Sequence, residues 1–186
     1  MVPEASLEHT EAGTVPATPG WFVLNARDAR WSEKPGQGHA LALTGLDASE
    51  AETLFPMLGM SIRVMSPGEP STTYHWETEQ EDFLVLSGEA TLIIEGQERL
   101  VRQWDFVHCP PGTRHAFAGA GSGPCVLLCV GSRRSQKDGP WGSYCSDPIA
   151  ERYNASSPEE TPDPRIAYAR FERSQLTRYP QDLLPG

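Results

Sequence analysis

Glycine and proline are frequent in this chain, and they restrict its possible folds more than any other feature of the sequence. Each contributes 17 of the 186 residues, which is well above average usage. A proline costs about 3 kcal/mol in the interior of a helix, so a chain this rich in turn-forming residues does not build long helices. A helical bundle or a coiled coil is therefore excluded.

The segments between the turns have the length and composition of β-strands. Strands are predicted over residues 21–24, 40–43, 61–65, 83–86, 90–95, 98–101, 106–109, 114–118 and 125–130. The sequence Glu95-Gly96-Gln97 is typical of a hairpin turn. Short strands at such close spacing indicate an all-β sandwich or barrel. One short helix is predicted over residues 48–54, because Asp47 suits an N-cap.

Composition divides the chain into three parts. Residues 1–20 are polar and without periodicity, so we expect a flexible N-terminal tail. Residues 21–134 carry the predicted strands and form the barrel domain. Residues 135–186 form a C-terminal extension with two predicted short helices, which begin at Asp147-Pro148 and Asp163-Pro164. Its aromatic residues indicate that this extension folds against the barrel or against a second subunit, and we expect a homodimer.

Charge and cysteine usage exclude several classes of partner. The 15 basic and 25 acidic residues give a net charge of −10, which disfavours nucleic acid, because binding it requires Lys and Arg to displace counterions. No segment has the roughly 20 apolar residues that a membrane span needs, and residues 1–20 do not resemble a signal peptide. The chain has four cysteines without Cys-x-x-Cys spacing, namely Cys109, Cys125, Cys129 and Cys145. We therefore expect reduced thiols and a cytoplasmic protein.

Four residues form a candidate metal site. Residues two apart in a strand point the same way, so His75 and Glu77 face one point together. After a turn, Glu81 can face back from the next strand, and His115 can complete the set from a distant one. Two imidazoles with one or two carboxylates inside a barrel suit a divalent transition metal.

The segments around these residues resemble the paired motifs of the cupin superfamily. The first motif of that family runs from a histidine pair through a glutamate to a glycine, and it matches His75, Glu81 and Gly88. The second motif ends with a proline-glycine turn and a histidine, which matches His115. The resemblance covers roughly residues 60–132. It implies an all-β, double-stranded β-helix (jelly-roll) barrel, to which the C-terminal extension adds short helices.

Three positions depart from the family pattern. Trp104 stands at a motif glycine and Gly119 at the usual closing asparagine. Glu77 stands where the family has its second histidine, and this changes the site. If Glu77 does not bind the metal, His75, Glu81 and His115 form a two-histidine, one-carboxylate set that suits non-heme iron or catalytic zinc. If Glu77 does bind, two carboxylates favour manganese, iron or zinc; otherwise Glu77 is a catalytic base or a hydrogen-bond acceptor near the metal.

The predicted function follows from this site. We expect a metal-dependent enzyme, dioxygenase-like or isomerase-like, that acts on a small polar molecule inside the barrel, with Glu77 as the acid–base residue. One alternative is a barrel that binds a metal or a small ligand without turnover, and another is a catalytically inactive structural barrel whose extension mediates dimerisation.

Several nearby residues have a simpler structural interpretation. Trp76 is expected to face away from the site, His108 to pack or hydrogen-bond, and Cys109 to be a small buried side chain. Arg63 and Arg114 are candidate anion anchors, but the surface is their expected place.

Overall fold

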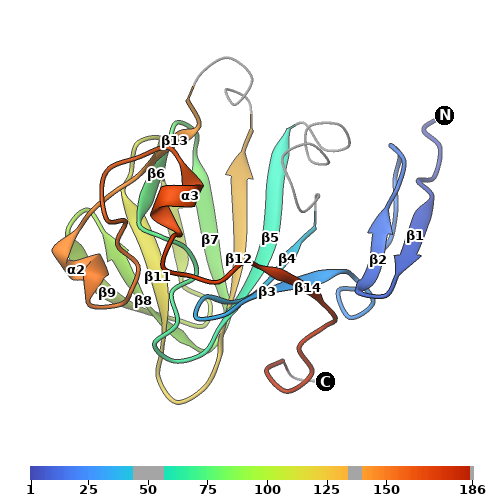
Figure 1. Cartoon of the computed structure of the whole chain (residues 1–186). Helices are drawn as coiled ribbons and strands as arrows, with labels where there is room; N and C mark the ends of the chain where they lie inside the picture. The colour runs from blue at the N-terminus through green and yellow to red at the C-terminus, as the bar shows by residue number, and fades with distance from the viewer. Residues whose placement is uncertain (44–56, 134–139, 185–186) are drawn as a thin grey trace.

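The structure, a computed structural model, describes residues 1–43, 57–133 and 140–184. Two antiparallel sheets form the body of the molecule (Figure 1). The first has seven strands in the order β10 (Phe106–Cys109), β7 (Glu81–Ser87), β12 (Cys125–Ser132), β5 (Leu58–Met65), β4 (Gly38–Ala42), β3 (Trp31–Lys34) and β14 (Gln175–Thr177). The second has five, in the order β13 (Gly142–Tyr144), β6 (His75–Glu77), β11 (His115–Ala120), β8 (Glu89–Ile94) and β9 (Gln97–Arg102).

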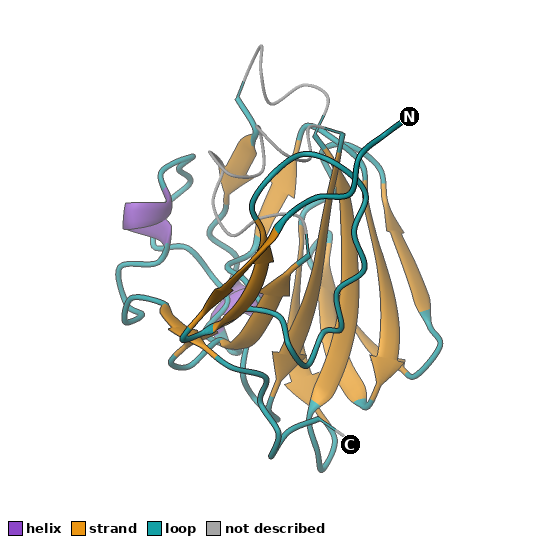
Figure 2. Ribbon diagram, turned by 90° about the vertical axis from the view of Figure 1, so that its right-hand side faces the viewer, coloured by secondary structure: helices purple, strands orange, loops and turns teal. Residues whose placement is uncertain are grey.

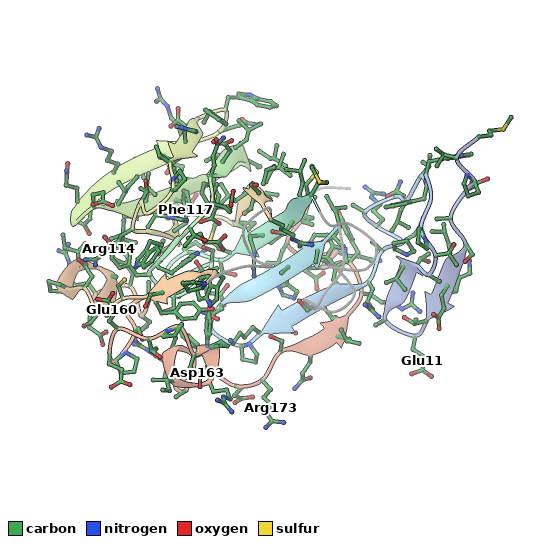
Figure 3. The ribbon with its side chains drawn as sticks, turned by 90° about the horizontal axis from the view of Figure 1, so that it is seen from above. Glu11, Arg114, Phe117, Glu160, Asp163 and Arg173 are labelled. Atoms are coloured by element: carbon green, nitrogen blue, oxygen red, sulfur yellow. The ribbon has the colours of Figure 1, made fainter. Side chains whose placement is uncertain are left out.

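The apolar core between the two sheets defines the interior of the barrel. Strands of the first sheet contribute Met65, Phe83, Val85 and Leu127, and strands of the second contribute Leu92 and Phe117. Figure 3 shows Phe117 between the strand layers. Because side chains alternate along a strand, this core shows which residues of each strand point inward.

The outer face of each sheet is also covered. Behind the seven-stranded sheet, a cluster around Trp31 and Val64 packs against Leu24, Tyr179 and Leu183 from the two ends of the chain. Behind the five-stranded sheet, Ile93, Ala116 and Ala118 pack against residues of the C-terminal extension. The two short helices, α2 (Pro148–Glu151) and α3 (Pro164–Ala167), lie outside the strand layers (Figures 1 and 2).

The all-β fold is confirmed, and most predicted strands fall within observed ones. The predicted strand over residues 21–24 is wrong, because only Trp21 there forms an isolated bridge, to Glu4. The predicted helix over residues 48–54 lies outside the described residues. Strands β3, β13 and β14 are not among the predicted strands; each has three or four residues, too few for a clear alternation.

Local backbone geometry explains two of the motif positions. Gly88 has φ of +75°, and a Cβ there would lie 2.3 Å from the carbonyl oxygen of Pro124, so only glycine fits this turn. At Gly119, where the family pattern has asparagine, a Cβ would lie 2.2 Å from the carbonyl oxygen of Ser66. The predicted hairpin turn joins β8 to β9 through Glu95 and Gly96, both with positive φ, as a type I′ turn requires.

The C-terminal extension packs on the barrel of its own chain. β13 pairs with β6, and β14 pairs with β3, so both sheets gain an edge strand from it. Its helices begin as predicted: the carboxylates of Asp147 and Asp163 accept hydrogen bonds from backbone N–H groups of the first turn of α2 and α3.

The N-terminal segment differs from the expected unstructured tail. Residues Leu7–Thr10 (β1) and Gly13–Pro16 (β2) form a hairpin at one side of the barrel, with Glu11 at its tip (Figures 1 and 3). Thr14 joins it to the rest of the chain through backbone hydrogen bonds with Asp28 and Arg30. These strands are too short and too polar to show periodicity in the sequence. In the described part of the chain, no helix has the length and apolar character needed to cross a membrane.

Candidate metal centre

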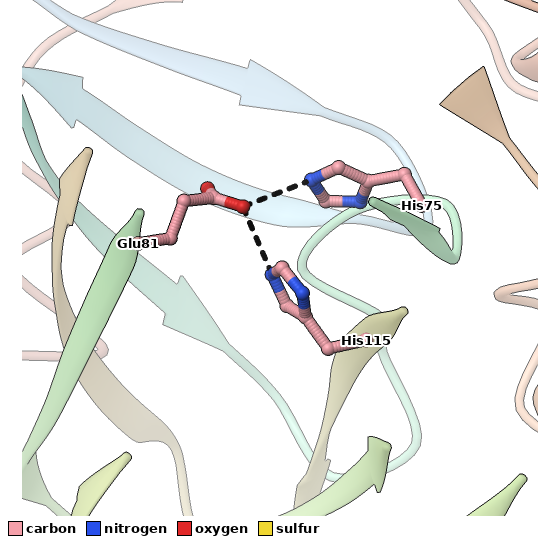
Figure 4. A group of neighbouring side chains, drawn as sticks. All are labelled: His75, Glu81 and His115. Atoms are coloured by element: carbon pink, nitrogen blue, oxygen red, sulfur yellow. Dashed lines mark ion pairs between the residues drawn. The ribbon is translucent and has the colours of Figure 1, made fainter. Parts of the chain in front are cut away.

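Three of the four predicted site residues come together inside the barrel. His75 lies on β6, Glu81 on β7 and His115 on β11, and each belongs to the inward-facing set of its strand (Figure 4). His75 and His115 are directly paired across β6 and β11. Glu81 reaches them from the opposite sheet, in line with Phe83 and Val85 of the core.

The three side chains are close enough to bind one ion. Oε2 of Glu81 lies 3.9 Å from Nε2 of His75 and 3.4 Å from Nε2 of His115. One ligand atom from each residue can be chosen so that all three lie within 4.8 Å of one another. Both histidines are buried, whereas Glu81 is half-buried.

Backbone carbonyls fix the orientation of both imidazoles. Nδ1 of His75 donates to the carbonyl oxygen of Thr73 at 2.7 Å, and Nδ1 of His115 donates to that of Thr113 at 3.0 Å. The proton of each neutral ring therefore sits on Nδ1, and the lone pair of Nε2 faces Glu81. Such a contact is how proteins orient a metal-binding histidine.

An unsatisfied polar atom supports the same interpretation. Nε2 of His115 is buried and has no hydrogen-bond partner among the described residues. A buried polar atom without a partner is costly unless something else binds it. A metal ion in the space between the two Nε2 atoms and Oε2 of Glu81 would satisfy it, so the donor set fits a divalent transition metal.

The pKa values of the three residues are shifted by burial. Burial, and then the proximity of His115, lower the pKa of His75 to about 3. Burial also lowers the pKa of His115. The pKa of Glu81 is raised to about 8 by burial and by the nearby carboxylate of Glu77, against the opposing effect of Arg63. At neutral pH both imidazoles are therefore neutral, as metal ligands must be.

Glu77 lies beside this group but does not belong to it. Among the described residues, the set that could hold a metal consists of His75, Glu81 and His115 alone. Glu77 is two residues from His75 on the same side of β6, and its charge acts on Glu81. Burial raises the pKa of Glu77 to about 7, whereas the guanidinium of Arg133 acts in the opposite direction.

Two aromatic residues of the extension also line the site, and the sequence did not place them there. Tyr144 pairs with His75 in the register of β13 and β6, and the centres of their rings are 5.9 Å apart. The ring of Trp141 lies 6.1 Å from that of His75 and 4.9 Å from that of Tyr144. Aromatic enrichment of the extension was the available signal, but the sequence does not show which strand the extension pairs with.

The simpler interpretations of four neighbouring residues agree with the structure. Trp76 packs on the outer cluster, away from the site. Nδ1 of His108 lies 2.7 Å from Oδ1 of Asp82 on the outer face, and Cys109 is buried. Arg114 is half-exposed and lies 3.8 Å from Glu160 (Figure 3).

Two other residues have notable positions. Arg63 does not lie on the surface as expected: it is half-buried, and it occupies the inward-facing set of β5. Trp104, at the motif glycine, is exposed and has φ of +74°, a backbone conformation that favours glycine.

Comparison with known proteins supports the fold. Residues 61–131 match the family model described as the cupin domain. The solved structure of the polyketide cyclase RemF from Streptomyces resistomycificus is similar over 61% of this chain and 80% of its own, with 16% identity and a TM-score of 0.50. At that identity the likeness concerns the fold alone.

Two further solved structures match part of the chain. A proposed sugar phosphate isomerase from Acidithiobacillus ferrooxidans is 30% identical, with a TM-score of 0.44, over 53% of this chain. This chain spans 62% of the length of that isomerase. The DMSP lyase DddQ from Ruegeria pomeroyi is 23% identical, with a TM-score of 0.42, over 50% of this chain and 45% of its own. Among curated proteins, no sequence matches this chain.

Fold and site together define a double-stranded β-helix barrel with a two-histidine, one-carboxylate group in its interior. The part of the barrel that matches the family model, residues 61–131, is a cupin domain.

Proposed function

We propose that this protein is a metal-dependent enzyme that acts on a small polar molecule inside the barrel. Its metal is a divalent transition ion (zinc, iron or manganese) held by His75, Glu81 and His115. The observation that carries the proposal is the arrangement of the two imidazoles. Both donate from Nδ1 to a backbone carbonyl, which leaves both Nε2 atoms directed at Oε2 of Glu81.

The neighbouring residues supply the rest of the chemistry. A bound divalent ion would act as a Lewis acid toward a substrate oxygen or a water molecule. Three protein ligands leave coordination positions open for them, as in catalytic sites. Glu77 is the proposed acid–base residue, because it shares the inward side of β6 with His75. Trp141 and Tyr144 form an aromatic wall that limits the access of water.

Metal analysis tests the site directly. We expect about one divalent ion per chain after reconstitution, and we expect His115→Ala to weaken zinc binding at least about 100-fold, because it removes one of three ligands. His108→Ala is the matched control, since His108 is an exposed histidine that pairs with Asp82 on the outer face. Elemental analysis and titration against a chelator of known affinity measure both quantities. A wild-type protein that remains metal-free, or equal affinities for His115→Ala and His108→Ala, would contradict the proposal.

The role of Glu77 separates catalysis from simple binding. Glu77→Gln keeps the size of the side chain but removes its basicity. We expect zinc affinity to fall less than in His115→Ala, because three ligands remain. Turnover should fall about 10²–10⁴-fold, the usual effect of losing a general base.

The Glu77 experiment needs a substrate, which a screen of small polar and carboxylated molecules with oxygen-uptake and product detection can provide. If Glu77→Gln loses zinc as completely as His115→Ala, then Glu77 is itself a ligand. If no molecule in the screen turns over while zinc is retained, the protein is better described as a binding module without catalysis.

A cytoplasmic location and a homodimer complete the proposal. All four cysteines are among the described residues and are free, as is typical of proteins in a reducing compartment. Leu100, Trp104 and Phe106 are exposed on β9, β10 and the turn between them, and an exposed apolar group of this kind suits a subunit interface.

A further inference from the structure

Two basic side chains, Arg63 and Lys34, lie on the inward face of the seven-stranded sheet. On β5, Val64 belongs to the outer cluster and Met65 to the core between the sheets. Because the side chains alternate, Arg63 points to the same side as Met65. On β3, Trp31 belongs to the outer cluster, so Lys34 also points inward.

The strand between them, β4, has small residues at its inward positions. In the register of the sheet, Ala40 of β4 is opposite Arg63, and Gly38 is opposite Lys34. The inward positions of this part of β4 therefore carry only a methyl group and a hydrogen atom. Arg63 and Lys34 therefore lie diagonally opposite each other across the small residues Gly38 and Ala40.

No acidic residue forms an ion pair with either cation in the described part of the chain. The ammonium of Lys34 lies over the ring of Tyr168, 3.7 Å from its centre, and makes no salt bridge there. Burial, and then repulsion by Arg63, lower the pKa of Lys34. Two half-buried cations that repel each other are costly unless an anion accompanies them.

Arg63 is also close enough to act on the metal centre. Its charge lowers the pKa of both His75 and Glu81, and it acts on Tyr144 of the aromatic wall. The groups on which its charge acts are thus the carboxyl of Glu81, the imidazole of His75, the phenol of Tyr144, the thiol of Cys129 and the ammonium of Lys34. With a divalent ion bound, Glu81 would share its single negative charge with that ion. Even with Glu77 ionised as well, the divalent ion, Arg63 and Lys34 would leave the interior with an excess of positive charge.

We propose that Arg63 binds a carboxylate group of the substrate, so that the molecule turned over in this barrel is a small carboxylic acid. This inference rests on the proposed function and names its substrate class. A guanidinium matches a carboxylate with two parallel hydrogen bonds, which positions the ligand as well as attracting it. In this proposal the substrate carboxylate lies between Arg63 and the metal centre, and the ammonium of Lys34 adds a longer-range electrostatic attraction. A neutral ligand would leave the excess charge uncompensated.

The test compares an anion with its neutral counterpart of the same shape. Propionate and propionamide are titrated into the zinc-loaded protein by calorimetry. We expect propionate to bind at least about tenfold more tightly than propionamide. Arg63→Gln should remove this preference, and Arg63→Lys, which keeps the charge but lacks the planar fork, should restore only part of it. Arg99→Gln, on the exposed strand β9, is the matched control and should bind propionate as the wild type does.

Each outcome decides between stated alternatives. Equal binding of propionate and propionamide by the wild type, or unchanged propionate binding in Arg63→Gln, would overturn the inference. If Arg63→Gln does not fold by circular dichroism, the comparison of Arg63→Lys with the wild type decides. Inorganic phosphate is a further probe. If phosphate binds more tightly than propionate, the inferred carboxylic acid is wrong and the substrate class is a phosphate ester. Zinc content is measured in every variant. If Arg63→Gln loses propionate binding but retains zinc, the result concerns the role of Arg63 alone. If the wild type does not bind zinc, the result refutes the proposed metal centre instead.

Discussion

Replacing Glu81 by glutamine should make the metal-free protein more stable at pH 8 and, at the same time, greatly weaken its metal binding. Glu81 is a half-buried carboxyl whose pKa burial and Glu77 raise to about 8, whereas an unfolded chain has its glutamates near their ordinary value of about 4.3. Folding the metal-free chain at pH 8 therefore requires either that the carboxyl take up a proton or that a buried carboxylate remain charged. Glutamine removes this cost.

The direction of the pH dependence follows from the same shifts. A carboxyl with a raised pKa in the folded state contributes its full stability below about pH 4.3, and that contribution is lost as the pH rises toward 8. The lowered pKa of His75, about 3, acts in the other direction: stability is lost as the pH falls below about 6.5, where the unfolded chain gains protons. The metal-free protein should accordingly be most stable between about pH 4.5 and 6.5, and less stable on both sides.

Melting temperatures, measured with and without zinc at several pH values, test both the effect of Glu81→Gln and the predicted pH dependence of stability. In chelator-treated samples, Glu81→Gln and the wild type should melt together at pH 4.5, and the variant should melt at least about 3 °C higher at pH 8, using about 2–4 °C per kcal/mol for a chain of this length. In the presence of zinc at pH 8, the wild type should have the higher melting temperature, because it retains the metal ligand that Glu81→Gln lacks. Glu159→Gln, an exposed position in the extension, serves as the control. A variant that is less stable than the wild type at pH 8 without metal would show that Glu81 is a structural ion-pair partner of the histidines.

The sequence predicts that His75, Glu81 and His115 lie together, because Glu81 and His115 belong to longer strands and His75 stands at the matching position of the first motif. His75, Glu81 and His115 could be assigned to one interior from their spacing, and the structure brings them within 4.8 Å of one another. Glu77 could not be resolved in the same way. The position of Glu77 in the strand gives the side of the sheet on which it lies. Whether its carboxylate binds the metal or lies beside the metal depends on a few ångströms, and these are set by how Arg133 and Glu81 pack around it.

The contribution of the extension could not be predicted, for a different reason. The helix starts at Asp147 and Asp163 follow from local chemistry, and the structure has both. The pairing of Tyr144 with His75 depends on a contact between segments about seventy residues apart, and a three-residue strand carries no periodic signal for it. The position of Arg63 could not be predicted either, because an arginine in a strand resembles a surface residue in the sequence, whereas β5 packs against a different cluster on each of its faces.

Replacing Ala150 by aspartate is expected to destabilise the whole protein, because α2 is packed tightly behind the five-stranded sheet. Ala150 is 0% exposed and belongs to a cluster with Tyr74, Ile93 and Ala116. A carboxyl group placed there would have no partner in the cluster. A buried polar group without a partner costs about 1–3 kcal/mol, and a charged one costs more. We therefore expect a loss of at least about 2 kcal/mol, or roughly 4–8 °C in melting temperature.

The same substitution should also affect the metal centre, because Cys145 of that cluster directly follows the strand that carries Tyr144. Displacing α2 would loosen β13 and expose His75 to water, so zinc should dissociate faster from Ala150→Asp than from the wild type. Ala169→Asp makes the same change at an exposed position of the extension, and it should alter neither the melting temperature nor the rate of zinc release. Equal melting temperatures for the two variants would mean that α2 is not part of the cooperative fold. A destabilised Ala150→Asp that still releases zinc at the wild-type rate would separate the two effects: the extension would then stabilise the barrel without closing its site.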